Sequence, residues 1–235
     1  MRLSRTPVLL AIAIFALSSG FAKADLVSNP TFSLQPTPAP ANYYAVIPSW
    51  TASMPGSNNV YSGALPMSGS NTCFDVFCSY GASAPSTVGF LQVYVPPYFG
   101  GYGIDPTSIL YQTFTTVAGD VYDFSYLQAG RTGQPDGPSF TGSVLNGPGL
   151  GGTSLFSHTT DLTDGGFTSV SGDFTASSSS TTIEFAAVND SRSIDETALV
   201  SNVNVNPAPE PSSFILLGTG LVGLAGAACR KMRKS

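Results

Sequence analysis

Two apolar segments near the ends of the chain limit what can fold as a globular domain between them. At the N-terminus, two arginines precede the apolar run Val8–Leu17, and Ala22-Lys23-Ala24 follows it. A basic start, a short apolar run and a small-x-small site are typical of a secretory signal peptide. The sequence therefore predicts that residues 1–24 are removed on export and that the mature chain begins at Asp25.

The second apolar segment, Phe214–Cys229, contains no charged side chain. As a helix it would span roughly 24 Å, against roughly 30 Å of bilayer hydrocarbon, and flanking residues can extend it. A basic cluster follows at once, and its members are Arg230, Lys231, Arg233 and Lys234. Positive charge keeps such an end in the cytoplasm. We expect one short transmembrane helix over about 212–229, a basic tail over 230–234, and the preceding chain outside the membrane. A buried core helix is the alternative.

The order of features in residues 207–235 resembles a known sorting signal. Pro209-Glu210-Pro211 precedes the apolar run, and the basic cluster follows it. This arrangement is similar to the PEP-CTERM signal of Gram-negative bacteria, which also carries the label ice-binding-protein C-terminal domain. The resemblance implies that an exosortase, a membrane cysteine transpeptidase, cuts near the tripeptide and releases or re-attaches the passenger. It also implies a transient inner-membrane anchor with the passenger in the periplasm, followed by transfer to the cell surface or extracellular matrix.

The passenger, residues 25–206, is strongly acidic. It contains two arginines against thirteen Asp and Glu residues, which gives a net charge of −11 with histidine neutral, whereas the whole chain carries −5. Binding to nucleic acid through phosphates requires a basic patch, so we expect no nucleic-acid partner. A solvated, repulsive surface explains the acidity, and an acidic recognition face is the alternative. We expect no cofactor, although a structural calcium ion would suit this charge.

Two cysteines, Cys73 and Cys78, lie close together in the passenger. In an exported chain such a pair predicts a local disulfide. Zinc is the alternative, but it needs two more ligands, and beyond carboxylates the passenger offers only His158.

Alternation of apolar and polar residues predicts an all-β passenger. We expect strands over 88–95, 108–117, 121–127, 181–188 and 199–205. Strands 108–117 and 121–127 are predicted to form a hairpin around Ala118-Gly119-Asp120, and 167–176 is predicted to pair with 181–188 in the same way. Residues 51–86 and 130–152 are rich in Gly, Ser and Pro and predict long irregular segments, followed by a short strand at 153–156.

Four stretches resemble galactose-binding-like, carbohydrate-module-like domains. They are the opening Asp25–Phe32, the segment 112–124 with Gln112, Phe114, Gly119 and Tyr122, the penultimate segment 174–185, and the closing strand 199–205. The resemblance implies a jelly-roll-type antiparallel β-sandwich. Relatives have acidic residues, some of which help to hold calcium, where this chain has Ser33, Ser201 and Asn202. Trp50 is expected to pack in the core, with sugar stacking as the alternative.

An aromatic and glycine-rich loop supplies the candidate ligand-binding residues Tyr98, Phe99 and Tyr102. Loops on a rigid β scaffold often bind ligands, although such a loop can also simply cap a sandwich. His158 is the one histidine, no G-x-S-x-G motif is present, and we expect it in a surface turn. A glycosidase needs only two carboxylates, and the passenger has many, including Asp123 and Glu184 on the more polar faces of predicted strands.

These patterns leave three functional hypotheses for the passenger. The first is a structural or adhesive surface protein sorted by an exosortase, and the second is a carbohydrate-binding module for extracellular polysaccharide. A glycoside hydrolase is the third, although we expect that the passenger is not an enzyme. The expected partners are the exosortase, the membrane during processing and, in the second hypothesis, a polysaccharide.

Overall fold

The computed structural model describes residues 25–34, 47–53, 62–66, 85–94, 107–131, 136–163, 166–188 and 195–208, and the single positions 219, 220, 223 and 230. The chain divides into two compact units, one comprising Asp25–Pro207 and the other comprising Met1–Ala24 with Ala208–Ser235. Within the described positions, no helix is both long enough and apolar enough to cross a membrane. All the strands that the structure describes lie within Asp25–Pro207.

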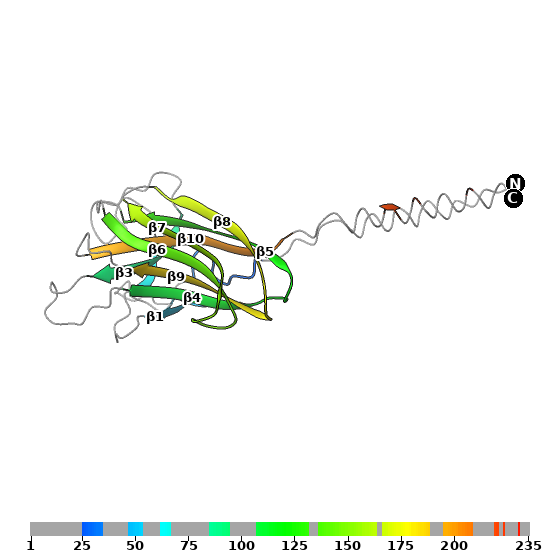
Figure 1. Ribbon diagram of the computed structural model, residues 1–235. Coiled ribbons are helices and arrows are strands. Elements are labelled where there is room, and N and C mark those ends of the chain that lie inside the picture. The colour runs from blue at the N-terminus through cyan, green and yellow to red at the C-terminus, as the bar shows by residue number, and fades with distance from the viewer. Residues whose placement is uncertain are drawn as a thin grey trace. The chain divides into compact units, whose positions relative to one another are not determined.

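The described residues of this unit form two five-stranded antiparallel sheets (Figure 1). The first sheet has the order β1 (Thr51–Ser53), β4 (Thr107–Thr115), β9 (Ser180–Val188), β6 (Asp136–Asn146), β7 (Ser154–Thr163). The second has the order β2 (Ser62–Pro66), β3 (Thr87–Tyr94), β10 (Asp195–Pro207), β5 (Val121–Gly130), β8 (Thr168–Thr175). The predicted antiparallel β-sandwich is therefore confirmed.

Alternating side chains from both sheets fill the space between them, as the period of a strand requires. Tyr126 of the second sheet meets Phe185 of the first edge-on, with ring centroids 5.0 Å apart. Phe140 stacks on Phe185 at 5.9 Å. All three rings are buried, so the centre of the sandwich is an aromatic cluster.

Both predicted hairpins are wrong in their pairing, although their strands exist. β4 pairs with β1 and β9, whereas β5 pairs with β8 and β10, so the turn after β4 carries the chain from one sheet to the other. The chain crosses in the same way between β8 and β9. Each strand buries one apolar face, and facing sheets satisfy that pattern as well as adjacent strands do. Local alternation therefore could not distinguish the two arrangements.

Two regions predicted to be irregular contain strands. Residues 130–152 contain the whole of β6, which forms a true hairpin with β7, and 51–86 includes β1 and β2. His158 lies half-buried within β7 and not in a turn. One of the glycines that suggested a loop, Gly142, has a packing role in β6, since a Cβ atom there would collide with the hydroxyl of Tyr126.

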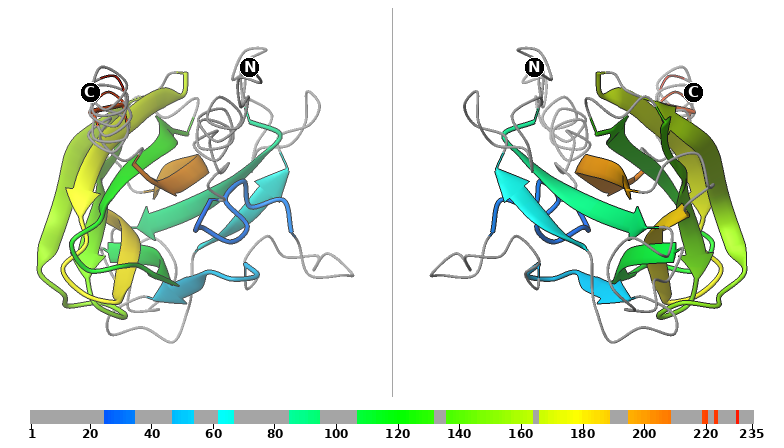
Figure 2. Two further views of the ribbon diagram at one scale, coloured as in Figure 1. Left: turned by 90° about the vertical axis from the view of Figure 1, so that its right-hand side faces the viewer. Right: turned by 90° about the vertical axis from the view of Figure 1, so that its left-hand side faces the viewer.

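The N-terminal segment, Asp25–Leu34 (dark blue in Figure 2), is tied to both sheets. Gln112 of β4 accepts a hydrogen bond from Ser28 N at 2.7 Å and donates to the carbonyl oxygens of Ser28 and Ser49. The indole N–H of Trp50 donates to Asn29 O at 3.1 Å. Trp50 is 4% exposed and lies 5.0 Å from the ring of Phe32, so its predicted core position is confirmed.

Candidate binding recess and sorting motif

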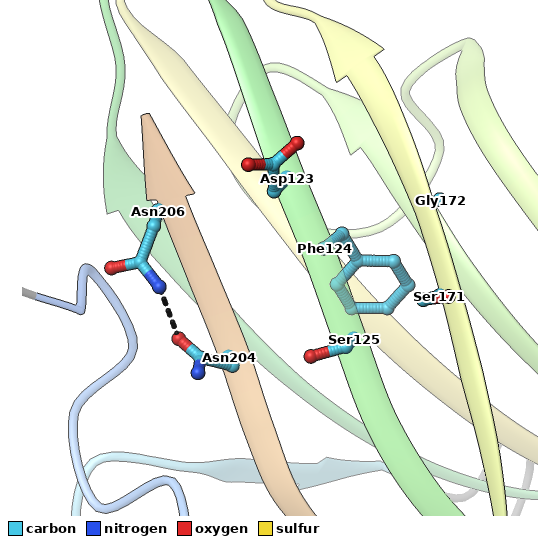
Figure 3. Close-up of a pocket in the computed structure, with 7 residues that line it drawn as sticks. All are labelled: Asp123, Phe124, Ser125, Ser171, Gly172, Asn204 and Asn206. Atoms are coloured by element: carbon cyan, nitrogen blue, oxygen red, sulfur yellow. Dashed lines mark hydrogen bonds between the residues drawn. The ribbon is translucent and has the colours of Figure 1, made fainter. Parts of the chain in front are cut away.

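The outer surface of the second sheet carries a recess of about 370 Å³, formed by β5, β8 and β10 (Figure 3). Its lining consists of Asp123, Phe124, Ser125, Ser171, Gly172, Asn204 and Asn206. Polar side chains predominate in this set. We refer to this site below as the recess.

The alternation of β5 explains why two polar side chains of the recess face outward. Tyr122, Phe124 and Tyr126 are buried in the core, and consecutive side chains of a strand point to opposite faces. Asp123 and Ser125 must therefore lie on the outer face of the sheet, where Asp123 is exposed.

A β-bulge in β10 turns the two asparagines outward. Before the bulge, Ala198 and Val200 face the core, whereas after it Val203 and Val205 do so. The register with β5 shifts between Ser201 and Asn204, and the extra residue Asn202 adopts a left-handed conformation with φ 50°. Since one extra residue exchanges the two faces of a strand, Asn204 and Asn206 lie outward only because of this bulge.

Strand register arranges the polar groups in two rows across the sheet. In one row Ser125 lies opposite Asn204 on β10 and Ser171 on β8. In the next row Asp123 lies opposite Asn206 on β10 and Asp173 on β8. The side-chain amide of Asn206 donates to Asn204 Oδ1 at 2.6 Å, which fixes one face of the recess (Figure 3).

The recess has the donors and acceptors that suit a ligand with several hydroxyl groups. An ionised carboxylate accepts hydrogen bonds, whereas amides and hydroxyls both donate and accept them. Phe124 is 1% exposed, so it forms part of the floor and offers no ring face for stacking. The recess thus offers side-chain hydrogen-bonding groups but no exposed aromatic ring face.

The two strand carboxylates singled out in the sequence do not meet. Asp123 lies on the outer face of the second sheet, whereas Glu184 of β9 lies on the outer face of the first sheet, because Ile183 and Phe185 fill the core. The sandwich separates them, so they cannot flank one glycosidic bond. Asp123 and Asp173 are the carboxylates that register does bring opposite each other.

Glu184 itself is half-buried, and burial raises the pKa of its carboxyl group. Tyr111 lies opposite it on β4 and Ser143 lies opposite it on β6. Within the described part of the chain, no group of three or more His, Cys, Asp or Glu side chains is placed to hold a metal ion.

Most site residues predicted from the sequence lie outside the described residues. They are the loop residues Tyr98, Phe99 and Tyr102, the pair Cys73 and Cys78, the tripeptide Pro209-Glu210-Pro211, and Lys231, Arg233 and Lys234 of the basic cluster. Arg230 is described, and it is exposed and helical. These assignments stay predictions.

The recess was not predicted from the sequence. A usable signal was present in Ser201-Asn202-Val203-Asn204-Val205-Asn206, where amides alternate with valines. An alternating run of this kind places all its amides on one face of a strand. The partners on β5 and β8 could not be read in the same way, because they come from pairings distant in the sequence.

Comparison with protein families confirms the predicted sorting tail. Residues 207–234 match the family model described as the PEP-CTERM protein-sorting motif. The chain therefore carries an exosortase sorting signal. This motif implies a secreted, membrane-anchored precursor that an exosortase processes.

Comparison with solved structures finds other β-sandwich domains. TmCBM61, solved with β-1,4-galactotriose, has a TM-score of 0.49 and 13% identity over 78% of this chain and 99% of that chain. The CBM22-1 xylan-binding domain from Paenibacillus barcinonensis Xyn10C has a TM-score of 0.47 and 11% identity, with coverages of 82% and 100%. The K2 adhesin domain of Lys-gingipain has a TM-score of 0.47 and 14% identity, with coverages of 80% and 99%. At these values we draw nothing about a ligand from the likeness. Comparison with curated protein sequences found no match.

Proposed function

We propose that the protein is an exported surface protein whose β-sandwich, residues 25–206, acts as a structural or adhesive module of the cell envelope or extracellular matrix. The observation that carries this proposal is the junction at Pro207. The sorting motif begins at the last residue of β10, so the sandwich is the passenger that the motif delivers. The passenger is strongly acidic and has only two arginines, which does not suit binding to nucleic acid. Such a net negative charge favours solubility of a module outside the cell.

The sorting step is tested by replacing Pro209-Glu210-Pro211 with three alanines in the full chain. We expect the variant to accumulate uncut in the membrane fraction, whereas the unaltered chain is cut and leaves that fraction. The measurement is the mass and location of the product in cells that make the exosortase. Normal processing of the alanine variant would contradict the proposal.

A second candidate function is binding of an extracellular polysaccharide in the recess. The observation that favours it is the set of one carboxylate, two amides and two hydroxyls around a hollow of about 370 Å³. The aromatic loop with Tyr98 and Tyr102 is the other candidate location on the same domain.

Variants of the two locations distinguish them. We expect Asn206→Ala and Asp123→Ala each to weaken binding by about 5- to 20-fold. Asn206→Ala removes a neutral hydrogen-bonding group and Asp123→Ala removes a charged one, and the factor corresponds to the loss of about one hydrogen bond. Thr115→Ala, exposed on the first sheet, is the control and should bind normally. The measurement is saturable retention on a panel of insoluble and soluble polysaccharides.

The pattern of losses decides between the sites. Weakening by Tyr98→Ala or Tyr102→Ala alone would move the site to the loop, and absence of binding to every polymer would exclude the second candidate. Release of reducing ends by the domain, abolished by Asp123→Asn and Asp173→Asn, would instead support the hydrolase hypothesis.

A further inference from the structure

The folded sandwich runs almost without a spacer into the sorting motif. Val205 is fully buried, and Asn206 and Pro207 still pair with Asp123 and Tyr122 of β5. Three residues, 206–208, separate Val205 from Pro209. Even when extended, three residues span only about 10–11 Å.

The end of β10 is held on its other edge by the first residues of the N-terminal segment. The carboxylate oxygen Oδ1 of Asp25 accepts hydrogen bonds from Val205 N and Val27 N, each at 3.0 Å. Leu26 N donates to Val205 O at 2.9 Å. On the opposite edge Val205 pairs with Phe124 of β5. Both backbone edges at Val205 are therefore occupied, and we call the contacts of Asp25 and Leu26 with Val205 the clamp.

A transpeptidase has to bind the chain on both sides of the bond that it cuts. Extended peptides are commonly bound by pairing their main-chain groups with an enzyme or domain as an added strand. Residues just before the tripeptide cannot make such contacts while they pair with β5. The last residues of β10 must therefore detach, and strand ends open locally at a small fraction of the total unfolding free energy.

We propose that the clamp controls how readily the exosortase gains access to the sorting motif, with Asp25 as a positioning residue for processing. The proposal rests on the sorting function proposed above. The clamp stabilises the closed end of β10, so a weaker clamp raises the open fraction and speeds cutting. Only the tertiary fold brings Asp25 and Val205 into contact, since they are 180 positions apart in the chain.

The experiment follows the half-time of processing of the full chain in cells that make the exosortase. We expect Asp25→Ala to shorten the half-time by about 2- to 10-fold, the range that loss of a hydrogen bond gives an opening equilibrium. Asp25→Asn keeps an Oδ1 acceptor and should behave like the unaltered chain. A Gly-Ser-Gly-Ser insertion between Pro207 and Ala208 should speed processing as well, and Asp25→Ala should then add nothing.

Two controls exclude trivial causes. Ser33→Ala alters an exposed residue of the N-terminal segment whose hydroxyl contacts Thr31 and not β10, and it should leave the half-time unchanged. The mass of the released passenger shows whether the signal peptide was removed before residue 25 in every variant.

Each outcome bears on a different proposal. An unchanged half-time in the insertion variant would overturn the proposal that the folded end of β10 limits access of the exosortase to the motif. This result would hold even if Asp25→Ala failed to fold. Faster processing of the insertion variant with no effect of a well-folded Asp25→Ala would overturn the role of the clamp. Failure of the exosortase to cut the unaltered chain would instead overturn the sorting function itself.

Discussion

Glu184 is a carboxyl group whose surroundings oppose its charge. It is half-buried on the outer face of the first sheet, and no described residue donates a hydrogen bond to its carboxylate. Burial penalises the ionised form and raises its pKa. The fold is therefore more stable with this carboxyl group protonated than with it ionised.

The pH dependence of stability follows from this direction. Because the folded-state pKa is raised, the contribution of Glu184 is complete below the unfolded-state pKa of about 4.3 and is lost as pH rises through the folded-state value. Glu184→Gln should therefore unfold like the unaltered chain near pH 3. Near pH 7 it should unfold at a higher temperature than the unaltered chain, and each kcal/mol gained would raise that temperature by about 2–4 °C for a domain of this size.

Thermal unfolding at the two pH values measures this difference. Asp120→Asn, which removes an exposed charge from a turn of the same acidic domain, shows how much of any gain comes from lower overall repulsion. Equal gains in the two variants, or a gain for Glu184→Gln at pH 3, would contradict the assigned cause.

At the scale of the element, β6 shows why composition misled the prediction. Glycine in a strand often marks a close approach of another group. At Gly142 that group is the side chain of Tyr126, which reaches across from the second sheet. Gly142 thus weakens the pattern that would predict a strand, and the same glycine leaves room for Tyr126 between the two sheets.

Gly142→Ala tests this packing. The added methyl group would overlap the buried Tyr126 side chain, so we expect a loss of about 1–3 kcal/mol in the free energy of unfolding. Gly166→Ala meets no atom within 4 Å and has an ordinary φ, so it is the matched control and should change stability little. Urea unfolding of the purified passenger measures both, and equal stability of the two variants would argue against the close contact.

The bulge of β10 is a second element whose effect extends beyond its own residues. One extra position, Asn202, exchanges the faces of the strand and so decides which side chains line the recess. The amides after it were visible in the sequence as an alternating pattern. Their direction was not, because the exchange depends on the pairing of β10 with β5.

At the scale of the whole molecule, the first residue of the predicted mature chain lies beside the last residues before the sorting motif, at one end of the sandwich. The clamp joins Asp25, the first residue of the predicted mature chain, to Val205, which lies just before the sorting motif. The same end carries the recess, whose Asn206 directly precedes that motif. The matched sorting motif therefore begins directly after a residue that lines the recess.

The amino-acid sequence by itself determined the sorting tail and the all-β class. Both depend on local order, since a tripeptide, an apolar run and a basic cluster follow one another, and strand alternation has a period of two residues. Only the tertiary structure decided which strands pair, where the recess lies and that Asp25 clamps Val205. These features arise from contacts between residues far apart in the chain, and two facing sheets bury the same alternating faces in many pairings. Side-chain packing, such as that of Tyr126 against Gly142, selects one strand pairing among these. Such packing cannot be predicted from the local pattern of apolar and polar residues.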